Sequence, residues 1–187
     1  MSLLFRNIQT IVRFNVNKMR RDVELIRSLM KIRQFDISVS CVDNSTIRAL
    51  NKRFRNTDEA TDVLSFPFYN VSEPMDPSSE ENMALARKEA AKEDPSIEAM
   101  ANDLGDIYLG IPYIRDRCRR TGFPLEDELV VLTTHGFAHL LGYDHETSLE
   151  DFKKMYLFEF GILAQFDQVS GRNTRKVKEA IFDNRKT

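Results

Sequence analysis

The segment LEDELVVLTTHGFAHLLGYDH, residues 125–145, joins a predicted long helix to all three histidines of the chain. Its buried stripe is predicted from positions that recur at intervals of three or four: Leu129, Leu132, Gly136 and Leu140. Gly142 suits the left-handed conformation that ends many helices, because glycine has no Cβ to clash there. The segment therefore predicts a central helix that starts at residue 125 and ends near residue 142.

The three histidines have the spacing of a metal site. On a helix, His135 and His139 project from the same face, about 5 to 6 Å from each other. A turn at Gly142 brings His145 back toward the same point. Two histidines alone form a hydrogen-bonded polar pair as readily as a metal site, but a third at this spacing favours an ion. Three imidazoles leave one coordination position for water, the arrangement of catalytic zinc, so we predict a zinc ion on these histidines and a catalytic role for His135.

Written as H-x-x-x-H-x-x-G-x-x-H, the same spacing coincides with the long zinc motif of the metzincin proteases. Those enzymes carry a glutamate directly after the first histidine as general base, and this chain has Gly136 there. A protease would need another base, with Glu146 or Asp144 as the nearest candidates. A metalloprotease-like hydrolase is therefore the less favoured alternative.

Strands and helices alternate through most of the remaining chain. The predicted elements are an edge strand in 3–12, a helix over 18–33, a strand over 36–42, a helix over 45–54, strands over 61–68 and 104–110, a helix over 111–120, and a last helix after the central one. We expect Phe54 in the buried stripe of helix 45–54, and a capping box of Thr147 and Glu150 before the last helix. The order predicts an α+β (α/β-like) class: one domain over 1–187, with helices packed around one small mixed sheet.

Composition narrows the class of protein. The net charge is -2, and no apolar run approaches the roughly 20 residues that a membrane-spanning helix needs. Cys41 and Cys118 are too few and too isolated for a disulfide framework, which favours a reducing compartment. Cys41 alternates with apolar residues in DISVSCV and is predicted to be a core residue.

Three segments have biased charge. Residues 1–21 hold five basic residues and no acid, the bias of a mitochondrial presequence, although an edge strand with a basic outer face explains the same residues. Residues 70–103 hold nine acids against three basic residues and are predicted to be an acidic insertion, either a flexible loop or an exposed helix that folds over the cleft or repels RNA. A basic C-terminal tail at about 169–187, and the segment RDRCRR (115–120), suit phosphate contacts or simple solvation.

At three places the chain resembles the YbeY family of endoribonucleases, also described as rRNA maturation factors. HGFAHLLGYDH (135–145), preceded by LEDELVVLTT, looks like the family signature. LNKRFRNTDEATDVLSFPF (50–68) is similar to the family segment with an arginine ahead of T-x-V-L-S-F-P, and LGDIYLG (104–110) is similar to the strand that follows. The resemblance covers about residues 35–165, without the acidic insertion.

The resemblance implies a metal-dependent, single-strand-specific endoribonuclease in rRNA maturation and ribosome quality control, with Zn²⁺ on His135, His139 and His145. Its partners would be an rRNA precursor and the small ribosomal subunit, with no membrane and no DNA. The resemblance also nominates Arg55 as catalytic. A planar guanidinium can hold a phosphate through two hydrogen bonds and stabilise the charge that develops during cleavage, whereas the simpler interpretation is a solvated residue at a helix end.

Three questions stay open at the level of sequence: the nucleophile, the class of protein and its location in the cell. Water or a substrate 2′-hydroxyl can attack the phosphate, and the end groups of the products distinguish them. A non-enzymatic zinc-containing ribosome-assembly factor is the competing class, and it would hold the ion with a fourth protein ligand such as Asp144 or a cysteine. The basic start favours a mitochondrial location, with the cytoplasm as the alternative.

Overall fold

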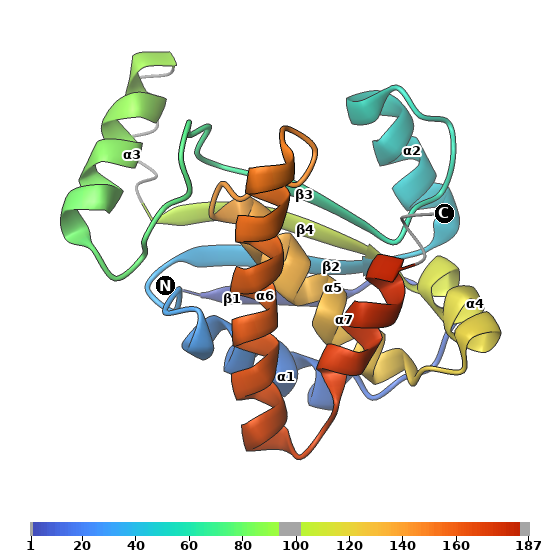
Figure 1. Ribbon diagram of the computed structural model, residues 1–187. Coiled ribbons are helices and arrows are strands. Elements are labelled where there is room, and N and C mark those ends of the chain that lie inside the picture. Colours follow the sequence, from blue (N-terminus) through green and yellow to red (C-terminus); the bar gives the residue numbers. More distant parts are fainter. Residues whose placement is uncertain (1, 94–101, 184–187) are drawn as a thin grey trace.

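The computed structural model describes residues 2–93 and 102–183, in which seven helices surround one four-stranded sheet (Figure 1). The strands are β1 (Leu3–Asn7), β2 (Asp36–Val42), β3 (Val63–Pro67) and β4 (Asp103–Gly110). Their order across the sheet is β1-β2-β4-β3. β1, β2 and β4 run parallel, and β3 pairs antiparallel with β4 at one edge. The predicted α+β class with a mixed sheet is confirmed.

Helices cover both faces of the sheet. They are α1 (Val16–Leu29), α2 (Asn44–Arg55), α3 (Glu80–Glu93), α4 (Ile111–Thr121), α5 (Leu125–Leu140), α6 (Leu149–Ser170) and α7 (Thr174–Asp183). α5 lies against β3 and β4, and α1, α6 and α7 pack around it (Figure 1). On the opposite face, Ile47 of α2 packs against Val42 and Leu64. Successive strand residues alternate between these two faces, which separates the two apolar clusters.

The central helix α5 is buried on nearly every side, and not only along the predicted stripe. It is enclosed because the sheet covers one side while other helices cover the rest. Its two buried hydroxyls are satisfied within the helix, where Thr133 donates to the Leu129 carbonyl at 2.7 Å and Thr134 to the Val130 carbonyl at 2.9 Å. Gly142 follows the helix with a φ of 87°, as expected for the residue that turns the chain back.

Gly136 lets α5 approach the sheet closely. A Cβ at this position would lie 2.7 Å from Ile107 Cδ1 and 3.2 Å from Ser65 Oγ. Gly136→Ala is therefore expected to lower the free energy of unfolding by about 1 to 3 kcal/mol, because the added methyl overpacks a closed contact. Urea denaturation measures the change.

Gly161 of α6 is the matched control, because a Cβ there meets no atom within 4 Å. Gly161→Ala is expected to raise the free energy of unfolding by about 0.5 to 1 kcal/mol, since alanine loses less backbone entropy in a helix. Equal effects of the two substitutions would show that the contact at Gly136 is not close-packed.

The N-terminal part of the chain contains the predicted strand and helix, and both are shorter than predicted. β1 forms the edge of the sheet but ends at Asn7, so residues 8–12 of the predicted strand lie outside it. α1 buries Met19, Val23 and Ile26 as predicted. Cys41 is fully buried in the main core.

Two local predictions were wrong. Phe54 is 55% exposed, because α2 covers only part of its face of the sheet, and its ring contacts Phe66 edge-on at 4.9 Å. The cap of α6 lies one residue later than predicted: the Ser148 side chain, and not that of Thr147, accepts the backbone N–H of Asp151. Ser148 is the residue with extended backbone torsions, which an N-cap requires.

The two charged segments contain helices that pack on the core. In the acidic insertion, α3 buries Met83, Ala86 and Ala90, so it is not a wholly exposed helix. Residues 94–101 of this insertion lie outside the described residues. In the segment predicted to be a basic tail, α7 packs against α5 and α6 and buries Val177, while residues 184–187 lie outside the described part.

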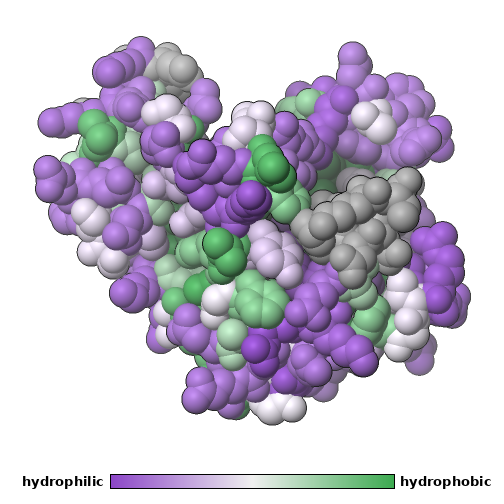
Figure 2. Space-filling view, viewed as in Figure 1, coloured by the Kyte–Doolittle hydropathy of each residue, from purple (hydrophilic) through white to green (hydrophobic). Residues whose placement is uncertain are grey.

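The face that carries α6 and α7 is largely hydrophilic, with apolar side chains over α6 (Figure 2). Leu149 and Leu157 of that helix are 70% and 68% exposed. Scattered exposed leucines are ordinary on protein surfaces. None of the described helices is both long and apolar enough to span a bilayer.

Candidate metal centre

The three histidines meet where α5 ends. His135 and His139 project from the last two turns of the helix, and His145 follows in the loop that Gly142 turns back. One ring nitrogen of each lies within 4.8 Å of the other two. The Nε2 atoms of His135 and His139 are 3.2 Å apart. The structure therefore brings together the three side chains that the sequence spacing pointed to.

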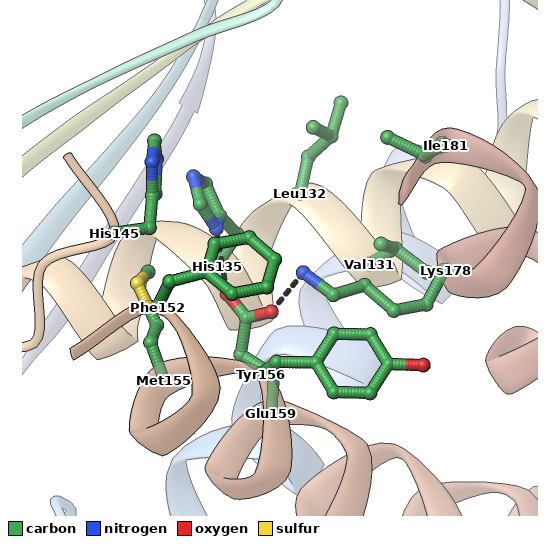
Figure 3. Close-up of a pocket in the computed structure, with 10 residues that line it drawn as sticks. All are labelled: Val131, Leu132, His135, His145, Phe152, Met155, Tyr156, Glu159, Lys178 and Ile181. Atoms are coloured by element: carbon green, nitrogen blue, oxygen red, sulfur yellow. Dashed lines mark hydrogen bonds and ion pairs between the residues drawn. The ribbon is translucent and has the colours of Figure 1, made fainter. Parts of the chain in front are cut away.

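Two acceptors orient the helical histidines. His135 Nδ1 lies 2.6 Å from Glu159 Oε1 of α6 (Figure 3), and His139 Nδ1 lies 3.0 Å from the carbonyl oxygen of Tyr143. A carbonyl oxygen and an ionised carboxylate can only accept, so each Nδ1 carries the proton. In the neutral rings, each Nε2 then presents a lone pair toward the cluster.

This donor set fits a metal ion. Two lone pairs facing each other at 3.2 Å repel unless a cation or a proton lies between them. Two nitrogen ligands of a tetrahedral zinc ion, each at roughly 2.0 to 2.1 Å, are themselves about 3.4 Å apart. Burial, together with the neighbouring His135 and His145, lowers the pKa of His139 to about 3, so this ring is neutral at physiological pH. Neutral imidazole is the form that binds metals.

Behind His135, Glu159 is a buried carboxylate with a second partner. The side chain of Glu159 is 1% exposed, and its Oε2 forms an ion pair with Lys178 Nζ of α7 (Figure 3). Burial raises the pKa of Glu159, but His135 and Lys178 outweigh it and hold the pKa well below its usual range. The carboxylate is therefore ionised and can accept the His135 Nδ1–H.

Neither Glu159 nor Lys178 was identified from the sequence. A signal for Glu159 was present, because it lies on the apolar stripe of α6 with Met155 and Ile162, where an acid is costly unless it is paired. No local signal pointed to Lys178, since it is one of several basic residues in its segment.

The histidines open into a cavity of about 140 Å³ that Arg55 also lines. Arg55 is the last residue of α2, and Asn56 after it adopts the left-handed conformation that ends the helix. Among the described residues, Arg55 has no ion-pair partner. A larger cleft of about 480 Å³ adjoins, lined by Arg55, His139 and the start of the acidic insertion at residues 70–74. The start of the insertion thus reaches the cleft, which the predicted role of folding over the cleft requires.

Ser65 and Glu146 also line the 140 Å³ cavity of the histidines. Ser65 Oγ is buried and, within the described part of the chain, has no hydrogen-bond partner. Glu146 lines both cavities. Asp144 lines only the larger cleft, and its Oδ1 accepts the N–H groups of His145 and Glu146. Burial raises the pKa of Asp144, but those N–H groups outweigh it and leave the pKa lowered, which makes Asp144 a poor proton acceptor.

Several basic residues proposed as phosphate contacts are paired inside the protein. Arg117 of RDRCRR donates to Asp62 at 2.6 Å and to the buried Glu128 at 2.8 Å. In the C-terminal segment, Arg172 is paired with Asp22 and Asp127, and Arg175 with Asp167. Carboxylates of the protein offset the charge of these guanidinium groups, which makes them weaker candidates for phosphate contacts than an unpaired arginine.

The three-histidine cluster at the end of α5, with His135 buried and His139 and His145 half-buried, opens into a cavity lined by an arginine that has no ion-pair partner among the described residues. This arrangement defines the class of metal-dependent hydrolases. The chain belongs to the endoribonuclease YbeY family, whose family model matches residues 5–167. The family identified from the three sequence segments is thereby confirmed, and the chain is an endoribonuclease.

Two relatives by sequence support the same family. "Endoribonuclease YbeY" of Homo sapiens is 31% identical over 183 residues, which cover 97% of this chain and 98% of the relative. The protein of the same name from Sulfurihydrogenibium sp. is 34% identical over 140 residues, covering 74% and 76%. A solution structure of the Thermotoga maritima protein TM1509 covers 89% of this chain and 93% of its own, with 22% identity and a TM-score of 0.49.

Proposed function

We propose that the chain is a zinc-dependent, single-strand-specific endoribonuclease that acts in rRNA maturation and ribosome quality control. The observation that carries the proposal is the shared cavity: His135, His139 and His145 line it together with Arg55. A phosphate in this cavity would contact both a bound cation and a guanidinium. Those are the two kinds of charge that stabilise phosphodiester cleavage.

Each residue of the cavity has a task in this proposal. The three histidine nitrogens hold the ion, and zinc bound there supplies positive charge to the reacting phosphate. Arg55 binds phosphate oxygens through two N–H groups and stabilises the charge that builds up on them. Ser65 donates a hydrogen bond from its hydroxyl to the substrate in this proposal, because Oγ has no hydrogen-bond partner among the described residues. Glu146 is the carboxylate placed to take a proton from the nucleophile, whether water or a 2′-hydroxyl.

An assembly factor with structural zinc is the second candidate, and the ligand set argues against it. Structural zinc sites are closed by four protein ligands. Among the described residues, only the three histidines form the cluster, and no cysteine or carboxylate joins them. Cys41 and Cys118 are buried in the apolar core. An open coordination position favours an enzyme.

The finer assignments of partner and location belong to the same proposal. An rRNA precursor and the small ribosomal subunit are the proposed partners, and the mitochondrion is the proposed location, with the cytoplasm as alternative. The acid-free basic segment 1–21 supports the mitochondrion. Because β1 in this segment pairs with β2, we expect import without removal of the segment. Cell fractionation, with N-terminal sequencing of the mature protein, tests both points.

Substrate class gives the direct test. The metal-loaded protein is expected to cut a labelled unstructured RNA and to leave denatured casein whole. Metzincin proteases with this histidine spacing carry their general base directly after the first histidine, and the contact of Gly136 with Ile107 and Ser65 leaves no room for a carboxylate there. Gel analysis of both substrates measures this.

His135→Ala is the control for contaminating ribonuclease, because it removes a metal ligand but not a contaminant. Casein cleavage that is lost in His135→Ala, with RNA left whole, would replace the ribonuclease by a protease. Cleavage of neither substrate, with co-purification of the small ribosomal subunit, would favour the assembly factor.

A further inference from the structure

Helix α7 lies beyond the part of the chain that the family model matches, which ends at residue 167. It nevertheless packs on α5 and α6, the two helices that carry His135 and Glu159. From α7, Lys178 reaches Glu159 Oε2, while Oε1 of the same carboxylate faces His135 Nδ1 (Figure 3). The three side chains form an uninterrupted line from α7 to the metal centre.

We propose that α7 is part of the metal centre, with Lys178 as a positioning residue that fixes Glu159 as the acceptor of the His135 Nδ1–H. This inference rests on the proposed binding of a metal ion by the three histidines. It assigns a role to a helix outside the family match.

The surroundings of Glu159 explain why a second partner is needed. The carboxylate faces a small space of about 40 Å³ lined mostly by apolar side chains, among them Val131, Leu132, Met155 and Ile181 (Figure 3). A buried carboxylate with one hydrogen bond left unmade is strongly destabilised. Lys178 forms an ion pair with the second oxygen and so fixes the rotation of the carboxylate. The orientation of the His135 ring follows from it.

Lys178 does not carry the docking of α7 alone. Val177 is 1% exposed, and Thr174 and Arg175 at the start of the helix bind the Asp167 carboxylate of α6. Arg172, just before the helix, is paired with Asp22 and Asp127. A change confined to residue 178 is therefore expected to leave α7 in place.

The test measures metal binding, not activity. Lys178→Met keeps most of the length of the side chain and removes the charge, and Lys176→Met makes the same change at an exposed position of α7. Competition with a chelator is expected to show zinc affinity about tenfold weaker in Lys178→Met, near the lower end of the 10- to 100-fold cost of losing an outer-shell partner. Lys176→Met is expected to bind like the parent, and Lys178→Arg to recover most of the loss. The visible absorption of bound Co²⁺ is expected to shift in Lys178→Met alone.

A double-mutant cycle with Glu159→Gln separates positioning from general stabilisation. If the lysine acts through the glutamate, Lys178→Met causes no further loss of metal affinity in the Glu159→Gln background. An equal loss in both backgrounds overturns the inference, as does an unchanged affinity and Co²⁺ spectrum in Lys178→Met. Absence of stoichiometric metal in the parent protein would instead refute the proposed zinc site itself.

Discussion

Replacement of His139 by alanine is expected to remove the bound zinc and to reduce RNA turnover by about a thousandfold or more. The two remaining histidines do not hold an ion tightly, because three protein ligands are the minimum of catalytic zinc sites. A metal ion contributes several kcal/mol of charge stabilisation, and each 1.4 kcal/mol corresponds to a factor of ten in rate. His139 suits this test because its Nε2 faces the proposed ion site, while its Nδ1 hydrogen-bonds to the backbone carbonyl of Tyr143.

Elemental analysis and initial rates on an unstructured RNA measure the two effects of His139→Ala. Glu150→Ala is the matched control, since Glu150 is a well-exposed residue at the start of α6 that lines none of the cavities around the histidines. Circular dichroism and thermal unfolding establish that both variants are folded. A folded His139→Ala protein that keeps stoichiometric zinc would remove this residue from the ligand set.

Arg55→Ala is expected to reduce RNA turnover by roughly ten- to a thousandfold while zinc content stays at the level of the parent. Arg55 lines the cavity of the histidines, whereas the acceptors that orient His135 and His139 are Glu159 and the Tyr143 carbonyl. The substitution therefore removes positive charge from the substrate site without disturbing the ligands. Arg55→Lys is expected to recover activity only in part, because an ammonium group does not offer the paired N–H geometry of a guanidinium.

Arg53→Ala provides the comparison for Arg55→Ala. Arg53 is an exposed arginine of the same helix, and its guanidinium lies over the Phe54 ring, at 5.1 Å from the centroid, and not in either cavity. Turnover numbers and Michaelis constants on the same RNA are measured for all three proteins. Equal rates for Arg53→Ala and Arg55→Ala would show that Arg55 contributes only to the general surface charge and has no specific role in turnover.

Local patterns in the sequence were sufficient for the central helix, the histidine cluster and the class of fold. Residues 125–145 contain the helical period, the two histidines four residues apart and the glycine at which the chain turns. Each of these features depends on residues close together in the chain, and the rules that link such patterns to backbone geometry are local. The structure accordingly has α5 and the turn at Gly142 where the sequence predicted them.

Packing between distant segments decided the rest of the site. Glu159 lies 24 residues from His135 and reaches it only because α6 packs on α5. Arg55 belongs to a helix on the opposite face of the sheet, yet its side chain lines the cavity of the histidines. The sequence could nominate Arg55 through the family resemblance, but the position of its side chain depends on where α2 ends beside β3.

The basic residues show most clearly what the sequence determines and what tertiary packing decides. In the sequence, Arg55, Arg117, Arg172 and Lys178 are equivalent cations in charged segments. In the structure, buried or half-buried carboxylates from other elements pair with Arg117, Arg172 and Lys178. Arg55 instead lines the cavity of the histidines and has no ion-pair partner among the described residues. Sequence determines which residues carry charge, but whether a charge is neutralised depends on its neighbours in space. Only the tertiary structure brings those neighbours together. A buried carboxylate without a partner is energetically costly, so a basic residue that packing places beside it forms an ion pair with it.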